Sequence, residues 1–119
     1  MNTFQMAEED FKLEIIGDIA IEKVNLLRAT LNEAQFFKNR LLLDSTNGYN
    51  KIIVDLSSCI YVDSTMIGAM VFVSKKISEK GGELRIVIPK KETFQVFTIK
   101  GLFSAFNLYE TIDEALKDF

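Results

Sequence analysis

The sequence predicts a single α/β domain with a mixed, mostly parallel β-sheet and helices packed on it. First, segments with strand spacing and segments with helix spacing alternate along the chain, in the order β-β-α-β-α-β-α-β-α. Second, residues 51–56 (KIIVDL) form a continuous β-branched run, which is typical of a strand covered on both faces. Third, 119 residues with 48% hydrophobic and 26% charged side chains suit one domain, which we place at residues 1–119.

The first strand is predicted at residues 11–19 (FKLEIIGDI). Its apolar residues Phe11, Leu13 and Ile15 alternate with charged ones, as expected for a strand with one buried face. Residues 2–6 (NTFQM) are expected to form its hairpin partner. This opening hairpin would supply the antiparallel part of the mixed sheet.

A long helix is predicted next, from Ile21 to Leu43. An apolar stripe with spacings of four and three residues supports this helix. The stripe consists of Ala20, Val24, Leu27, Leu31 and Ala34. Polar residues 44–50 (DSTNGYN) then indicate a loop that leads into the central strand.

The chain after the central strand continues the alternation. A helix is predicted at residues 64–82, where a glycine pair ends it, and a strand follows at residues 83–89. A short helix is predicted at residues 90–101, with Phe94 and Phe97 turned inward.

The last predicted elements are a short strand near residues 108–110 and a terminal helix at residues 111–119. Thr111 and Glu114 match the S/T-x-x-E capping box, in which the two residues satisfy the first free amides of a helix.

The composition argues against several classes of protein. A net charge of −3 and a pI of about 5.0 argue against a nucleic-acid partner, because phosphate binding needs concentrated Lys and Arg. The chain contains no His, which excludes a Ser-His-Asp or Cys-His arrangement and the commonest zinc ligand. No apolar run reaches the roughly 18 residues that span a bilayer. We therefore expect no metal, no cofactor and no membrane insertion.

The single cysteine, Cys59, cannot form a disulfide within the chain, and a reducing compartment such as the cytoplasm fits it best. No signal peptide is recognised at the start of the sequence. Cys59 is expected to be a small buried hydrophobe. An enzyme with Ser64 or Cys59 as its nucleophile is disfavoured because the chain has no histidine base and no Lys lies near Ser64 in sequence. The sequence therefore predicts a protein that is not an enzyme.

Asp55 raises a rival hypothesis, because it ends the central strand as a phospho-accepting Asp does in a receiver domain. A receiver also needs clustered acidic residues after its first strand to bind Mg²⁺, and this chain offers only Asp18 there. We expect Asp55 to make a hydrogen bond to the loop that follows it.

The sequence YVDSTMIGAM, residues 61–70, places polar residues directly before an apolar helix. Asp63, Ser64 and Thr65 are all residue types favoured at a helix N-cap. In open α/β sheets functional groups gather outside the carboxyl ends of strands, and this segment follows such an end. The free amides and the dipole of the helix would tolerate a phosphate on Ser64, so the cap is also a candidate modification site.

Several short motifs follow one another along the chain. An apolar strand ends in VDLS, YVDS precedes a helix, and GGEL ends that helix. GLF and TIDEAL lie farther along, and LEIIGDI lies near the start. In these motifs and their order, roughly residues 11–118 resemble the STAS domain family of anti-sigma factor antagonists. The resemblance implies a single STAS domain.

The resemblance also implies a function in transcription regulation and signal transduction. The Ser after the Asp, here Ser64, would be phosphorylated by a GHKL-type serine kinase that is itself an anti-sigma factor or a switch protein, with Thr65 as the alternative acceptor. The unphosphorylated form would bind this kinase, and a PP2C-type phosphatase would reset the system. The expected partner-binding residues are Asp63, Ser64, Thr65, Met66, Gly68 and Asp18.

Three positions depart from the family pattern. Met66 stands where the family has Gly, although Gly68 keeps a small residue nearby, and Met66 is expected to add bulk beside the docking loop. Ala20 stands where the family often has an acidic residue, and Thr65 replaces a second Ser. These departures leave an alternative open, a non-switching STAS subunit of a transporter or of a stress-signalling complex.

Overall fold

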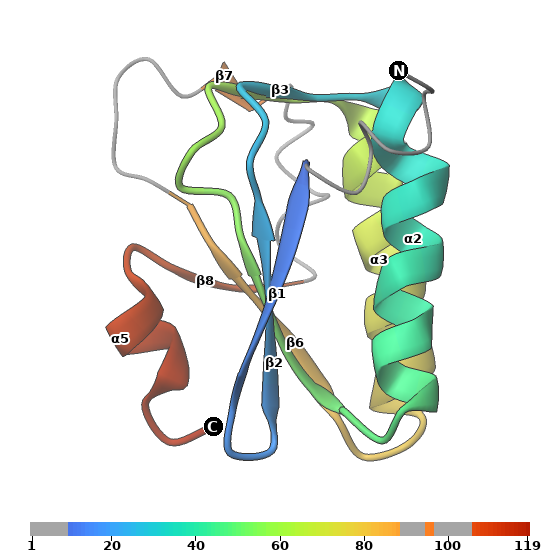
Figure 1. The fold of residues 1–119 in the computed structure, drawn as a ribbon, viewed down its shortest axis with the longest axis vertical. Helices are drawn as coiled ribbons and strands as arrows, with labels where there is room; N and C mark the ends of the chain where they lie inside the picture. Colours follow the sequence, from blue (N-terminus) through green and yellow to red (C-terminus); the bar gives the residue numbers. More distant parts are fainter. Residues whose placement is uncertain (1–9, 89–94, 97–105) are drawn as a thin grey trace.

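A computed structural model describes residues 10–88, 95–96 and 106–119 (Figure 1). Its main sheet has five strands in the order β1-β2-β4-β6-β8. Their bounds are β1 Phe11–Ile16, β2 Ile19–Val24, β4 Lys51–Asp55, β6 Glu83–Val87 and β8 Asn107–Tyr109. The β1–β2 pair is antiparallel and the other pairs are parallel. The predicted fold class, an α/β domain with a mixed and mostly parallel sheet, is confirmed.

The described helices cover both faces of this sheet. Helices α2 (Leu31–Thr46) and α3 (Ser64–Ser78) lie side by side on one face, and α5 (Ile112–Leu116) lies on the other (Figure 1). The larger core fills the space between the sheet and the first two helices, with Phe37, Leu41 and Met70 among its fully buried side chains. A smaller core lies beneath α5.

A second, three-stranded sheet lies beyond the carboxyl end of the main one. Strands β3 (Arg28–Ala29), β5 (Tyr61–Val62) and β7 (Gln95–Val96) pair in parallel in the order β3-β5-β7. Each is two residues long, which is too short for any periodicity to predict. The helix predicted at residues 90–101 is wrong at residues 95–96, which form β7. The rest of that segment, with Phe94 and Phe97, lies outside the described residues.

The long helix predicted from Ile21 to Leu43 is also wrong in its first part. Residues 19–24 form β2, and the helix begins only at Leu31. Ala20 and Val24 are four residues apart, and an even spacing places two side chains on one face of a strand as well as on one face of a helix. Leu27, the next residue of the predicted apolar stripe, is 67% exposed, so the stripe does not correspond to one buried helix face.

The first strand is confirmed at Phe11–Ile16, and its partner among the described residues is β2. It pairs with β2 through a turn in which Gly17 takes a φ of 60°, a conformation that glycine adopts without steric cost. The predicted partner, residues 2–6, lies outside the described residues. Only Phe11 of the predicted apolar face is buried, while Leu13 and Ile15 are 39% and 41% exposed.

Four other predicted elements are confirmed within a few residues. They are the strands at residues 51–56, 83–89 and 108–110 and the helix at residues 64–82. Of the two hydrogen bonds of the predicted terminal capping box, the one to Thr111 is present. Thr111 Oγ1 accepts a hydrogen bond from the Glu114 N–H at 3.1 Å, but Glu114 Oε2 accepts from Glu110, one residue before the cap.

A buried charged cluster lies beneath α2. Glu22 on β2 and Asp44 on α2 are buried, and Arg40 Nε donates to Glu22 Oε1 at 2.7 Å. Burial, a hydrogen bond with Glu22 and the charge of Glu22 raise the pKa of Asp44 from 3.8 to about 8, while Arg40 lowers it. Glu22 Oε2 and Asp44 Oδ2 receive no hydrogen from any N–H or hydroxyl of the described residues. A proton held by Asp44 at neutral pH therefore satisfies both carboxyl groups.

Candidate functional site

The segment at residues 61–70 is held at the carboxyl end of the sheet, where the sequence predicts it. Strand β5 lies between β3 and β7, and the Asp63 N–H donates to the Ala29 carbonyl at 3.1 Å. The chain then turns directly into α3 at Ser64. The small sheet thus fixes the start of α3 against the segment that leads into α2.

Asp63 connects the N-termini of both long helices through its one carboxylate. Its Oδ1 accepts from the Met66 N–H at 2.9 Å, which makes Asp63 the N-cap of α3. Its Oδ2 accepts from the Leu31 N–H at 2.8 Å, in the first turn of α2. The positive ends of two helix dipoles therefore meet at one negative side chain.

A complete capping box stabilises the start of α2. Thr30 Oγ1 accepts from the Asn32 N–H, and Glu33 Oε2 accepts from the Thr30 N–H at 3.4 Å. The T-x-x-E sequence was a signal for this helix start, but the predicted longer helix placed it in a helix interior.

Ser64 and Thr65 occupy the first turn of α3, and both are exposed. Because Asp63 is the cap, Ser64 is the first helical residue and its hydroxyl is not used for capping. Among the described residues the Ser64 hydroxyl makes no hydrogen bond. Ser64 can therefore be reached from solvent while the helix start stays satisfied by another side chain.

Met66 and Gly68 take opposite positions on α3. The Met66 side chain is fully buried in the larger core, so its bulk does not lie beside a docking loop as predicted, and its side chain offers no surface to a partner. Gly68 is exposed, and a Cβ placed there would meet no atom within 4 Å. Ala20 is also fully buried, on β2.

Asp18 is not brought together with the other predicted site residues. It lies in the β1–β2 turn and forms an ion pair with Lys51 at 3.1 Å, next to the amino end of β4. That turn and the start of α3 lie at opposite ends of the main sheet (Figure 1).

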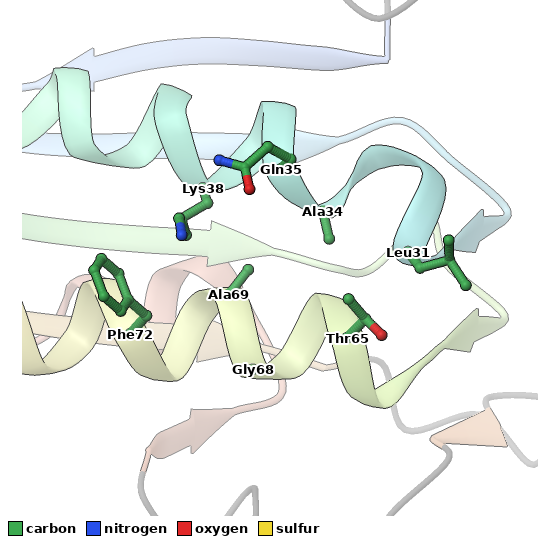
Figure 2. Close-up of a pocket in the computed structure, with 8 residues that line it drawn as sticks. All are labelled: Leu31, Ala34, Gln35, Lys38, Thr65, Gly68, Ala69 and Phe72. Atoms are coloured by element: carbon green, nitrogen blue, oxygen red, sulfur yellow. The ribbon is translucent and has the colours of Figure 1, made fainter.

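A groove runs between α2 and α3 from the start of both helices. Its volume is about 450 Å³. Figure 2 shows the side chains of the two helices that face each other across it. It is lined by Leu31, Ala34, Gln35, Lys38, Thr65, Gly68, Ala69 and Phe72. Thr65 and Gly68 were predicted as site residues, and the groove adds the α2 residues and Phe72 to them.

Exposed apolar side chains near the start of α3 were not predicted as part of the site. Leu31 is 64% exposed, and Leu27 and Ile60 are also exposed. The Ile60 N–H donates to the Leu27 carbonyl at 2.7 Å, which joins the two segments beside β3 and β5. The sequence signal was present as apolar residues near the polar YVDS segment, but the predicted stripe assigned Leu27 and Leu31 to the core.

Asp55 and Cys59, the two other candidate reactive groups of the sequence, are both buried. Asp55 is buried, and its Oδ1 accepts from the Ser57 N–H at 2.9 Å, as expected for a loop hydrogen bond. Burial, with the charge of Asp55 added, raises the pKa of the buried Cys59 thiol to about 12. Within residues 10–88, 95–96 and 106–119 no group of three metal-ligating side chains occurs. No helix in these ranges is long and apolar enough to cross a membrane.

Comparison with known proteins gives consistent matches along the chain. The model of the STAS domain matches residues 5–115. A protein of Thermotoga neapolitana, provisionally named an anti-sigma factor antagonist, is 32% identical over 109 residues, which are 91% of this chain and 96% of that protein. The crystal structure of a Thermotoga maritima protein with the same provisional name has a TM-score of 0.74 and 29% identity, covering 92% of this chain and 93% of that one.

More distant structures share the fold. The anti-sigma factor antagonist SpoIIAA in its unphosphorylated form has a TM-score of 0.67 at 14% identity, covering 87% of this chain and 91% of SpoIIAA. SpoIIAA of Bacillus in its phosphorylated form has a TM-score of 0.64 at 17% identity, covering 88% and 95%.

Proposed function

The chain belongs to the STAS domain family, and from this premise we propose that it is an anti-sigma factor antagonist switched by phosphorylation of Ser64. The relatives that carry the anti-sigma factor antagonist name span nearly the whole chain, which supports the first half of the proposal. The second half depends on the geometry of the α3 start.

The observation that carries the switch is the division of roles between Asp63 and Ser64. Asp63 caps α3 and holds Leu31, while the neighbouring Ser64 hydroxyl is exposed at the same helix end. A kinase can therefore modify Ser64 without removing a hydrogen bond on which the helix depends.

A phosphate at this position would change the surface without unfolding the domain. It brings a charge of about −1.5 to −2 at pH 7, and the amides and dipoles of two helix N-termini stabilise negative charge. A partner docked on the exposed apolar residues around Ser64 would meet this charge at the contact. Desolvation and like-charge repulsion there weaken binding.

The proposed partners follow from this switch. The unphosphorylated chain binds an anti-sigma factor that is a GHKL-type serine kinase, and a PP2C-type phosphatase removes the phosphate. Both encounters take place in the cytoplasm. The chain acts as a substrate and a binding partner rather than as an enzyme, which agrees with the buried Cys59 and with a sequence that contains no His.

The non-switching alternative was motivated by Met66 and Ala20, which depart from the family pattern. Both side chains are fully buried, so neither changes the surface that a kinase would meet. No other observation favours the alternative over the switch.

The experiment starts from the kinase that copurifies with the unphosphorylated chain. Incubation with ATP and mass spectrometry then map the phosphate. We expect it on Ser64, and we expect Ser64→Ala to bind the kinase without being modified. Ser78→Ala, at the exposed far end of α3, is the matched control and should be modified like the wild type. Phosphate on neither Ser64 nor Thr65 would refute the switch.

A further inference from the structure

The groove between α2 and α3 combines small residues at its base with two large apolar side chains at its borders. Ala34, Gly68 and Ala69 leave room between the helices, and Leu31 and Phe72 border the space (Figure 2). Leu31 and Phe72 are 64% and 41% exposed, and they lie on the two facing helices at the borders of the same groove. From Thr65 to Phe72 the groove follows about 10 Å of helix, at 1.5 Å per residue.

The charged side chains in and beside the groove are Lys38, which lines it, and Lys76, which lies next to Phe72, although the whole chain has a net charge of −3. The Lys38 ammonium lies 4.4 Å from the centre of the Phe72 ring, and the Lys76 ammonium lies 5.6 Å from it. Neither ammonium forms an ion pair with a carboxylate of the described residues. At the end of the groove near the helix starts, Thr65 lies in the first turn of α3, where the Asp63 carboxylate caps the positive end of the helix dipole.

We propose that this groove binds an acidic amphipathic helix of the protein partner. Two turns of such a helix match the length of the groove, with apolar side chains against Leu31 and Phe72 and carboxylates toward Lys38 and Lys76. The charge pattern selects this occupant over a neutral or basic segment, because Lys38 lines the groove, Lys76 lies beside its border residue Phe72, and no carboxylate is among the lining residues. The inference rests on the proposed function, whose partner it describes.

The position of the groove links it to the switch. Thr65 lines the groove and Ser64 precedes it, so a phosphate on either would add negative charge at the end of the groove. An acidic helix would then be repelled by the modified chain and attracted by the unmodified one. One surface would thus account for binding and for its loss.

The test replaces Gln35, an exposed residue of the groove, by the photocrosslinking amino acid benzoylphenylalanine in cells of the native host. Mass spectrometry identifies the crosslinked peptide. We expect a segment of a partner protein with net negative charge and apolar residues at helical spacing. Binding of that purified partner should fall about tenfold or more in the variant Lys38→Glu/Lys76→Glu, because two attractions become repulsions.

The matched control is Lys12→Glu/Lys23→Glu, which makes the same change of charge. Lys12 and Lys23 are exposed cross-strand neighbours on β1 and β2. They point to the face of the sheet that α5 covers, since they alternate with the residues that face α2. This variant should bind the partner as the wild type does. Melting curves of both variants check that they are folded.

The inference is overturned by a basic or neutral crosslinked segment, by a peptide from this chain itself, by a lipid adduct or by no crosslink. Equal effects of the two charge variants would overturn it as well. Kinase binding and Ser64 phosphorylation without groove dependence would leave the switch standing and reject the groove. Groove binding without phosphorylation of Ser64 or Thr65 would do the reverse.

Discussion

Replacing Asp63 by Ala should destabilise the domain more than the loss of an ordinary helix cap, because this carboxylate holds two helices. The variant loses the bond to Met66 at 2.9 Å and the bond to Leu31 at 2.8 Å. An N-cap contributes about 1 kcal/mol, and a further hydrogen bond to a charged group contributes about 1.5–3 kcal/mol. The free energy of unfolding should therefore fall by about 2.5–4 kcal/mol. Asp63→Asn keeps one carbonyl oxygen and should lose about half of that.

Urea denaturation followed by circular dichroism measures these changes, provided that the slope of each transition stays constant. Thr111→Ala is the matched control, because Thr111 caps α5 alone with a single bond to the Glu114 N–H at 3.1 Å. It should cost about 1 kcal/mol. The reasoning is refuted if Asp63→Ala costs no more than this control, or if Asp63→Asn costs as much as Asp63→Ala.

Three further predictions concern other parts of the fold. Asp44 has a pKa raised to about 8 beside Glu22, so its contribution to stability is complete below pH 3.8 and is lost as the pH rises toward 8. Asp44→Asn should therefore gain stability relative to the wild type between pH 4 and pH 8 in urea titrations across that range, and a constant difference would contradict the shared proton. Gly82→Ala should lower the free energy of unfolding by about 1–3 kcal/mol, and with it the melting temperature, because its Cβ would overlap a backbone carbonyl. Gly68 lies in a helix with open space around it, so Gly68→Ala should raise the free energy of unfolding by about 0.5–1 kcal/mol. A change of the same sign in both glycine variants would contradict this reasoning. Met66→Ala should cost about 2–5 kcal/mol in chemical denaturation because the side chain is fully buried, and a cost under about 1 kcal/mol would argue that this side chain is not part of the core.

The sequence predicts the central strands and α3 well because each has a pattern with a single meaning. Residues 51–56 are too short and too apolar for a surface helix, and residues 63–82 carry a capping residue, an apolar run and a glycine end. The helix prediction was wrong in the region from Ala20 to Ala34, because a spacing of four residues fits both a strand and a helix. Burial in the tertiary structure decided between them, and no local pattern contains that information.

The sequence predicts the segment of the candidate site at residues 61–70, but not the side chains from other parts of the chain that lie beside it. Asp63 and Ser64 are visible in the sequence because caps and modification sites use few residue types. The bond from Leu31 to Asp63 joins residues 32 positions apart, so only the packed fold reveals it. The groove likewise needs α2 and α3 side by side, and Met66 could be placed inside the core only when the face of α3 was known.

The central claim is that phosphate on Ser64 switches partner binding while the domain stays folded. The most direct measurement is the Kd of the copurifying kinase for the chain with phosphoserine built in at position 64, compared with the unmodified chain. A like-charge contact costs several kcal/mol and each 1.4 kcal/mol is tenfold, so we expect a Kd about a hundredfold higher or more. The melting temperature should stay nearly unchanged. An equal Kd for the two forms, with both folded, would contradict the account.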